Sequence, residues 1–208
     1  MAYLLSSATD PEAYRPKFFH VLLHAVVLNG GRIDEIGDFK SCGVLMPPGK
    51  DVGNPWTWTQ AGFIGVLLKL GISGIAKMVK EIEPLKDRAK AKVLRKDEKY
   101  YYIFFLGTSK EARGKGHCSK IVREYQEVAR NENLPIWIEA GTEYCMRLYE
   151  RLGFVQVDEL LMGKGKCDKD GKMKVGGEGV TIWGMIWRPE VLGRPISGTL
   201  SHEGYVKK

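Results

Sequence analysis

The stretch YYYIFFLGTSKEARGKGHCS, residues 100–119, decides the fold. Its first seven residues are aromatic or aliphatic on both faces, which predicts a buried central strand rather than a surface helix. A glycine-rich basic loop follows, and apolar residues then recur at helical spacing to about residue 133. The apolar run at 135–140 predicts the next strand. A strand, loop, helix and strand in this order predict parallel pairing through a right-handed crossover.

The loop between this strand and this helix has the composition of an anion site. Backbone N–H groups and the positive end of a helix dipole converge at such a position. Glycine at 114 and 116 removes the Cβ atoms that would keep a pyrophosphate away, while Arg113 and Lys115 add positive charge. The spacing matches neither a Walker A loop nor a GxGxxG fingerprint. Taken alone, the pattern fits either a phosphate site or a simple turn.

The flanking sequence predicts further helices and strands. We expect a helix over 16–29, a short strand over 39–46 and a largely helical region over 59–95, broken near Gly71 and Gly74 and again at Pro84. After residue 140 we expect a second helix that ends at Gly153. Two strands over 154–161 and 180–187 should follow, joined by a polar hairpin over 163–179. This organisation predicts one α/β domain over residues 1–191 and a tail over 192–208.

Composition limits the remaining classes. A chain of 208 residues with 44% hydrophobic content can bury one ordinary core. Its longest apolar runs are shorter than a bilayer span, and the start does not resemble a secretory signal, so we expect a cytoplasmic protein without a membrane partner. Four scattered cysteines predict free thiols and no metal site. The net charge of +7 fits a solvated basic face or a phosphorylated cofactor. Without a recognition motif, nucleic acid is not an expected partner.

Two motifs resemble a known family. Leu106-Gly107-Thr108 followed by Arg113-Gly114-Lys115-Gly116 is similar to the acetyl-CoA motif of GCN5-related N-acetyltransferases (GNATs), Gln/Arg-x-x-Gly-x-Gly/Ala. Downstream, LYERLGF at 148–154 resembles the second signature of that family, LYxxxGF. The resemblance covers residues 100 to about 160. The stretches GVLMPPG at 43–49 and IWRP at 186–189 resemble a fungal branch related to puromycin N-acetyltransferase.

The resemblance implies a GNAT fold, a mixed central sheet splayed between two parallel strands with helices on both faces. Coenzyme A would lie in the gap, and the activity would be acetyl transfer from acetyl-CoA to an amine of a small molecule. The implied cofactor-binding residues are Leu106, Gly107, Thr108, Arg113, Gly114, Lys115, Gly116, His117, Cys118, Ser119 and Thr142. Cys118 replaces the usual Gly or Ala, and Thr142 stands where many members have an asparagine. The start of the chain is short for the full first strand and first helix of the family, with only residues 3–7 as a candidate.

Acetyl transfer needs a neutral amine, a stabilised oxyanion and a proton for the leaving thiolate. By resemblance, Tyr149 would donate that proton, since a phenol with a pKa of about 10 can protonate a developing thiolate. Backbone N–H groups near 106–108 would hold the oxyanion. Glu139 is the candidate general base, with a cap of the following turn as the alternative. His20 and His24 share a helical face, where histidines without a third ligand more often pack.

Other readings stay open at this point. The acceptor could be a protein N-terminus or a lysine side chain, or the chain could bind acyl-CoA without catalysis as a sensor. A homodimer is also left open.

Overall fold

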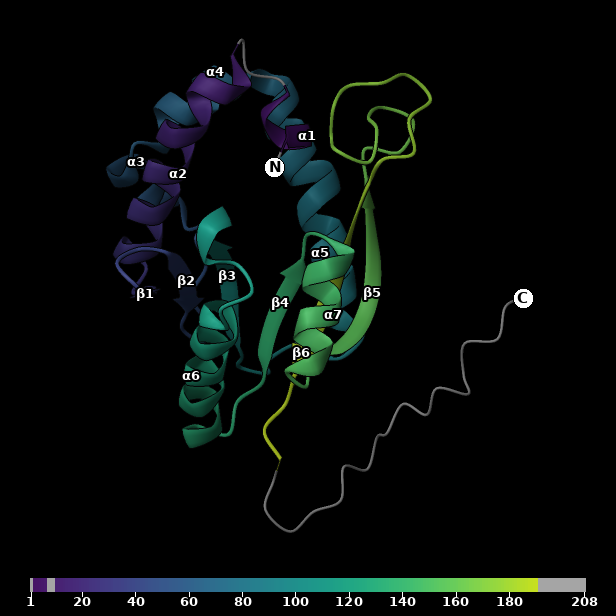
Figure 1. The fold of residues 1–208 in the computed structure, drawn as a ribbon. Helices are drawn as coiled ribbons and strands as arrows, with labels where there is room; N and C mark the ends of the chain where they lie inside the picture. Colours follow the sequence, from purple (N-terminus) through teal and green to yellow (C-terminus); the bar gives the residue numbers. More distant parts are fainter. Residues whose placement is uncertain (1, 7–9, 191–208) are drawn as a thin grey trace, which may run out of the picture.

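The computed structural model describes residues 2–6 and 10–190 and shows a six-stranded mixed sheet with helices on both faces (Figure 1). The strand order is β1-β2-β3-β4-β6-β5. The elements are α1 Ala2–Leu5, α2 Pro11–Leu28, β1 Arg32–Ile36, β2 Ser41–Met46, α3 Pro55–Ala61, α4 Phe63–Lys77, η1 Met78–Ile82, α5 Glu83–Ala91, β3 Tyr101–Thr108, η2 Lys110–Ala112, α6 His117–Asn131, β4 Ile136–Ala140, α7 Glu143–Arg151, β5 Val155–Met162 and β6 Val180–Trp187. The predicted mixed α/β fold is confirmed.

The two central strands, β3 and β4, are parallel and separate soon after they meet. Their pairing joins residues 101–103 to residues 136–138, and within the described chain it stops there. Strand β3 continues to Thr108 along its antiparallel partner β2, with one extra residue, Phe104, at a register shift opposite Val44 and Leu45. A bulge of this kind bends a strand and increases its twist. The splay predicted from the motifs is therefore present.

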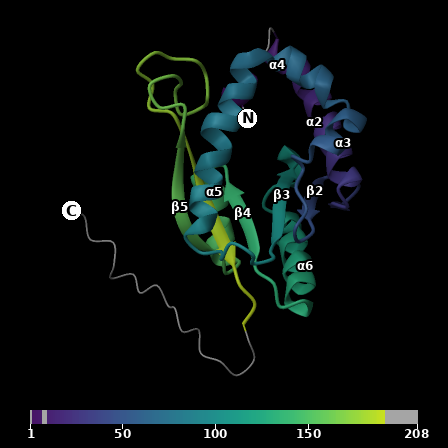
Figure 2. The same cartoon turned by 180° about the vertical axis from the view of Figure 1, so that it is seen from behind.

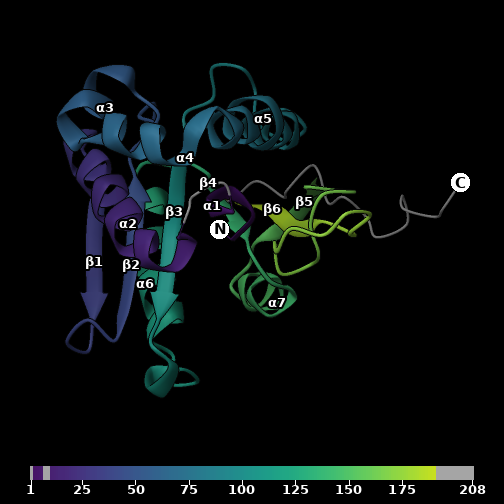
Figure 3. The same cartoon turned by 90° about the horizontal axis from the view of Figure 1, so that it is seen from above.

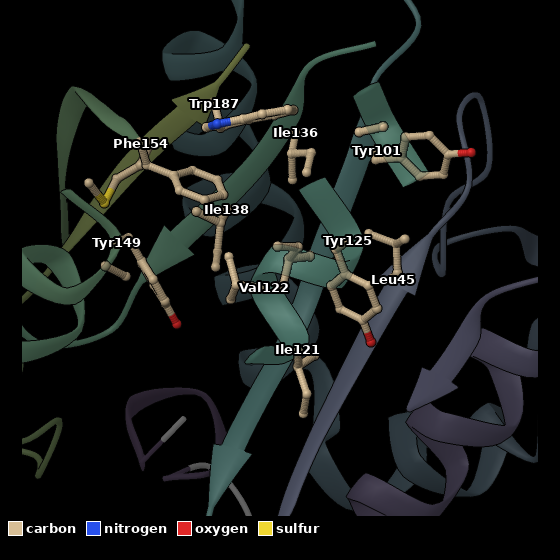
Figure 4. Close-up of a cluster of buried hydrophobic side chains, with 14 residues drawn as sticks. Leu45, Tyr101, Ile121, Val122, Tyr125, Ile136, Ile138, Tyr149, Phe154 and Trp187 are labelled. Carbon is tan, nitrogen blue, oxygen red and sulfur yellow. The ribbon is translucent and has the colours of Figure 1, made fainter. Parts of the chain in front are cut away.

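The helices divide between the two faces of the sheet. Helices α6 and α7 cover one face, and α2 to α5 cover the other (Figure 3). On the α6 and α7 face, Ile136, Ile138 and Tyr149 belong to the largest buried cluster (Figure 4). On the opposite face, Trp137 packs into a cluster with Ala89 of α5. Seen from behind, α4 and α5 arch over the ends of β3 and β4 (Figure 2). Each face thus has its own core.

The N-terminal quarter differs from the prediction. Helix α2 begins at Pro11 because the side chain of Asp10 accepts a hydrogen bond from the Ala13 N–H and caps it, whereas we expected a start at Pro16. Residues 2–5 form a short helix, so the candidate segment over 3–7 is helical in its first three residues. Strand β1 was not predicted, because its charged sequence RIDEI lies on an exposed edge and lacks an apolar signal.

The helical region over residues 55–91 is broken where glycine permits it. Gly71 has φ 63° and ψ −179°, so the predicted kink in α4 is confirmed. Gly74 lies inside α4, where Gly71 is the residue with non-helical dihedral angles, so the predicted break at Gly74 is wrong. Pro84 lies in the first turn of α5, where its missing N–H costs nothing.

Glu81 of η1 links the long loop between β5 and β6 to helix α1. This carboxylate accepts hydrogen bonds from the Tyr3 hydroxyl at 2.9 Å and the Gly163 N–H at 2.5 Å, and it pairs with Lys166 at 3.0 Å.

The predicted tail over 192–208 lies outside the described residues. Among the helices that are described, none is long and apolar enough to cross a membrane.

Candidate functional site

A cleft of about 780 Å³ opens where β3 leaves β4, between the N-terminus of α6 and helix α7. It is lined by Leu106, Gly107, Thr108, Ala112, Arg113, Gly114, Gly116, His117, Cys118, Ser119, Thr142, Tyr144, Cys145, Leu148, Tyr149 and Arg151. Ten of the eleven predicted cofactor-binding residues are in this set, and Lys115 is the exception. The set contains two arginines and, among these described residues, no carboxylate. The cleft therefore suits an extended anionic ligand with apolar sections.

The glycine-rich loop leaves room for a phosphate group. Gly114 and Gly116 have φ of 77° and 78°, and an added Cβ at either position would meet no atom within 4 Å. Gly116 precedes α6 without a side-chain cap, and the first helical hydrogen bond of this turn is donated by the Lys120 N–H. The N–H groups of residues 117–119 thus face the loop as donors, with the positive end of the helix dipole behind them. These are the features that bind a pyrophosphate.

The edge of β3 forms a second wall of the cleft. Residues 105–108 are hydrogen-bonded to β2 on one side, and their other edge faces the gap left by β4. An unpaired strand edge offers alternating N–H and C=O groups. A ligand that contains amides can bind this edge through the same backbone hydrogen bonds that an additional β-strand would make.

Tyr149 reaches the cleft from α7. Thr142 caps this helix, with its Oγ1 accepting a hydrogen bond from the Cys145 N–H at 3.2 Å. The tyrosine is 5% exposed, its ring centroid lies 6.0 Å from that of Phe154, and its hydroxyl points away from Phe154 (Figure 4). Burial, followed by the nearby thiols of Cys118 and Cys145, raises the pKa of Tyr149 above its usual value. The phenol therefore keeps its proton at neutral pH.

Two thiols lie in the same cleft. Burial, and then the neighbouring Cys145, raise the pKa of Cys118 to about 11, so this side chain is a neutral thiol that fits where the family usually has Gly or Ala. All four cysteines lie in the described part of the chain and are free thiols, as predicted.

Glu139 lies on the other face of the sheet. Its Oε1 accepts a hydrogen bond from Trp137 Nε1 at 2.6 Å, and its Oε2 accepts one from the Tyr102 hydroxyl. The alternative role as a cap of the following turn is wrong, because Thr142 caps that helix. The histidines at 20 and 24 are exposed on α2, so the expectation that they pack is also wrong.

Sequence reasoning missed the surroundings of Glu139. The sequence indicates Tyr102 only as part of an apolar strand and Lys86 only as part of the helical region over 59–95. Lys86 Nζ lies 3.2 Å from Glu83 and 5.4 Å from the centre of the Tyr102 ring. Burial acts to lower the pKa of Lys86, but the carboxylates around it, led by Glu139, outweigh burial and raise it. The register of the two parallel strands could have indicated this group. Residue 102 pairs with 137, and 137 and 139 lie on the same face of β4, so the three side chains share one face.

The splayed strands, the basic loop at a helix N-terminus and the tyrosine opposite it define the GNAT class of fold. Residues 61–154 match the model of the acetyltransferase (GNAT) family. An uncharacterized N-acetyltransferase of Schizosaccharomyces pombe is 27% identical over 140 residues, 67% of this chain and 56% of that protein. An uncharacterized protein of Saccharomyces cerevisiae is 32% identical over 120 residues, 57% of this chain and 51% of that protein.

A solved structure shares the fold. Arylalkylamine N-acetyltransferase 2 of Aedes aegypti matches with a TM-score of 0.54 and 15% identity, covering 84% of this chain and 80% of that structure. By these matches the chain is similar to N-acetyltransferases of the GNAT family, and it shares their fold. The chain spans about half the length of the curated relatives it matches.

Proposed function

We propose that this protein is an N-acetyltransferase that transfers the acetyl group of acetyl-CoA to an amine of a small molecule. The observation that carries the proposal is the cleft itself. It joins an unpaired strand edge and a glycine-rich helix N-terminus, which suit an anionic ligand that contains amides, to a buried tyrosine that can donate a proton. We assign this activity to the domain over residues 1–191.

The residues of the cleft divide the cofactor between them. The N–H groups of 117–119, with Gly114, Gly116 and Arg113, would hold the pyrophosphate. The free edge of β3 at Leu106 and Thr108 would pair with the pantetheine amides, and Thr142 would border the same chain. Lys115 would contribute charge near the loop without lining the cleft.

The chemistry would then need few side chains. Bound acetyl-CoA supplies an activated acyl group. Backbone N–H groups near residues 106–108 stabilise the charge that develops on the carbonyl oxygen. Tyr149 donates a proton to the departing sulfur. Because its pKa is raised, the phenol gives up this proton only while the C–S bond breaks and not before. Glu139, on the opposite side of the gap, accepts the proton that the amine loses.

A small acceptor is favoured by the setting of Glu139. The carboxylate is half-buried and lies beneath α5 with Tyr102 and Trp137, where a slender amine fits better than the surface of a folded protein. The similarity of residues 43–49 and 186–189 to the puromycin N-acetyltransferase branch points the same way, and this finer placement stays a prediction.

Mass spectrometry tests the proposal. The protein would be incubated with acetyl-CoA and a panel of alkylamines, arylalkylamines, polyamines, lysine peptides and free peptide N-termini. We expect acetylated small amines at rates above those for every peptide. Faster acetylation of peptides would move the proposal to a protein acetyltransferase. Binding of coenzyme A without any product would replace the enzyme with an acyl-CoA sensor.

A further inference from the structure

Tyr102 and Glu139 meet at the point where the two central strands separate. Residue 102 is paired with Trp137 across the two strands, and the last pair is Ile103 with Ile138. Glu139 is therefore the first residue of β4 beyond the pairing, and the Tyr102 hydroxyl reaches it across the start of the gap. Tyr102 and Trp137 pack in the cluster on the face opposite Tyr149, and Glu139, two residues after Trp137 and hydrogen-bonded to it, lies on the same face.

The Tyr102 oxygen is placed to accept a hydrogen bond from an amine. Each oxygen of Glu139 already accepts one bond from the protein, from Trp137 or from Tyr102. Tyr102 has one O–H group and uses it toward Glu139, so its oxygen keeps lone pairs that can accept from an incoming N–H. The acceptor can thus reach Glu139 through Tyr102.

Charged groups from three directions face the Tyr102 ring. Lys86 and Lys90 of α5 place their ammonium groups 5.4 and 5.1 Å from the ring centre. The carboxylates that act on Tyr102 are Glu139 of β4, Glu83 of α5 and Asp51 of the loop after β2. Burial first, and then these carboxylates, raise the pKa of Tyr102 well above its usual value. A phenol in this state releases its proton only as it receives another.

We propose that Tyr102 is a catalytic residue that takes the proton of the acceptor amine and passes its own proton to Glu139. The proposal rests on the proposed acetyltransferase function and adds the group that touches the amine. As the amine nitrogen forms its bond to the acetyl carbon, an N–H proton moves to the Tyr102 oxygen and the Tyr102 proton moves to Glu139 Oε2. The C–S bond breaks with its electron pair on sulfur, which takes a proton from Tyr149.

The relay predicts that Tyr102 and Glu139 act as one unit. Kinetics would compare Tyr102→Phe, Glu139→Gln and the double variant, using the best amine of the panel. We expect each single variant to lose about a hundredfold in kcat, and the double variant to lose no more than either one. Coenzyme A affinity measured by calorimetry should stay unchanged in all three.

Tyr100→Phe is the matched control. This tyrosine also lies under Lys90, at 5.5 Å, but the hydrogen bonds to Glu139 come from Tyr102 and Trp137, so its variant should keep the wild-type rate. A purely structural role for Tyr102 would lower the melting temperature and the coenzyme A affinity together with the rate. Three outcomes would overturn the relay but leave the proposed function standing. They are this structural pattern, a wild-type rate in Tyr102→Phe, and additive losses in the double variant. A wild-type protein that acetylates no amine would instead remove the proposed function, and the relay with it.

Discussion

The two sides of the sheet are built in different ways. The cleft on the α6 and α7 side is formed by two continuous segments, residues 106–119 and 142–151, and depends largely on backbone groups. The site around Glu139 joins side chains from β3, β4 and α5, which are far apart along the chain. The cleft has a recognisable sequence motif, because few residue types allow the backbone conformation that its loop requires. The site around Glu139 has almost no sequence motif, because its side chains come from separate segments.

The largest expected effect concerns the backbone side. Gly116→Trp should abolish binding of coenzyme A, because the new side chain would fill the open space in front of the α6 N-terminus. Calorimetry would measure the affinity. Gly165→Trp is the control, since Gly165 has a similar φ of 76° and similar open space but lies in the loop after β5. Equal affinities in the two folded variants would contradict the assignment of the loop.

A second effect should appear at Tyr149, the one side chain to which we give chemistry on the cofactor side. Tyr149→Phe keeps the ring in its core and deletes the proton, so kcat should fall about a hundredfold with little change in coenzyme A affinity. Steady-state kinetics with a series of acyl donors would sharpen the test, because a more acidic leaving thiol should reduce the loss. Tyr101→Phe removes a hydroxyl from the same buried cluster and should keep its rate. If the two variants behave alike, Tyr149 is a core residue.

On the side-chain face, Glu139→Gln should lower the rate without lowering coenzyme A affinity. The amide of glutamine cannot accept the proton that the amine loses, so the variant should be about a hundredfold slower at saturating substrate. Steady-state kinetics and calorimetry would measure the two quantities, and a wild-type rate in the folded variant would remove Glu139 from the mechanism.

The smallest expected effect is on stability, at the contact that ties α1 to the loop after β5. Burial acts to raise the pKa of Glu81, but the hydrogen bonds from Gly163, Lys166 and Tyr3 outweigh it and lower the pKa. A lowered folded pKa stabilises the protein above the unfolded value of about 4.3 and loses that contribution as pH falls through the folded value.

Glu81→Gln should therefore cost about 1–3 kcal/mol near pH 7, and the difference from wild type should shrink below about pH 4. Melting temperatures across this range would show it. Glu127→Gln removes an exposed ion pair with Arg130 and should cost less than about 1 kcal/mol. A difference for Glu81→Gln that is constant with pH would contradict the assigned ionisation.

The same contrast explains how far the sequence could predict the molecule. The central strands, α6, α7 and ten of the residues that line the cleft followed from apolar runs, glycine spacing and the resemblance of two motifs. Strand β1 carries charges on an exposed edge, and the start of α2 depends on one capping aspartate, so neither had a strong local signal. The Tyr102 contact depends on the register between β3 and β4, which is a property of the fold rather than of either segment.

Hydrogen–deuterium exchange with and without coenzyme A tests the division between the two faces most directly. We predict slower exchange on binding in peptides covering residues 104–119 and 142–151, since their free N–H groups would gain partners. Peptides covering residues 83–95 should not change until an amine acceptor is added. Protection of residues 83–95 by coenzyme A alone, with none at 104–119, would contradict the account.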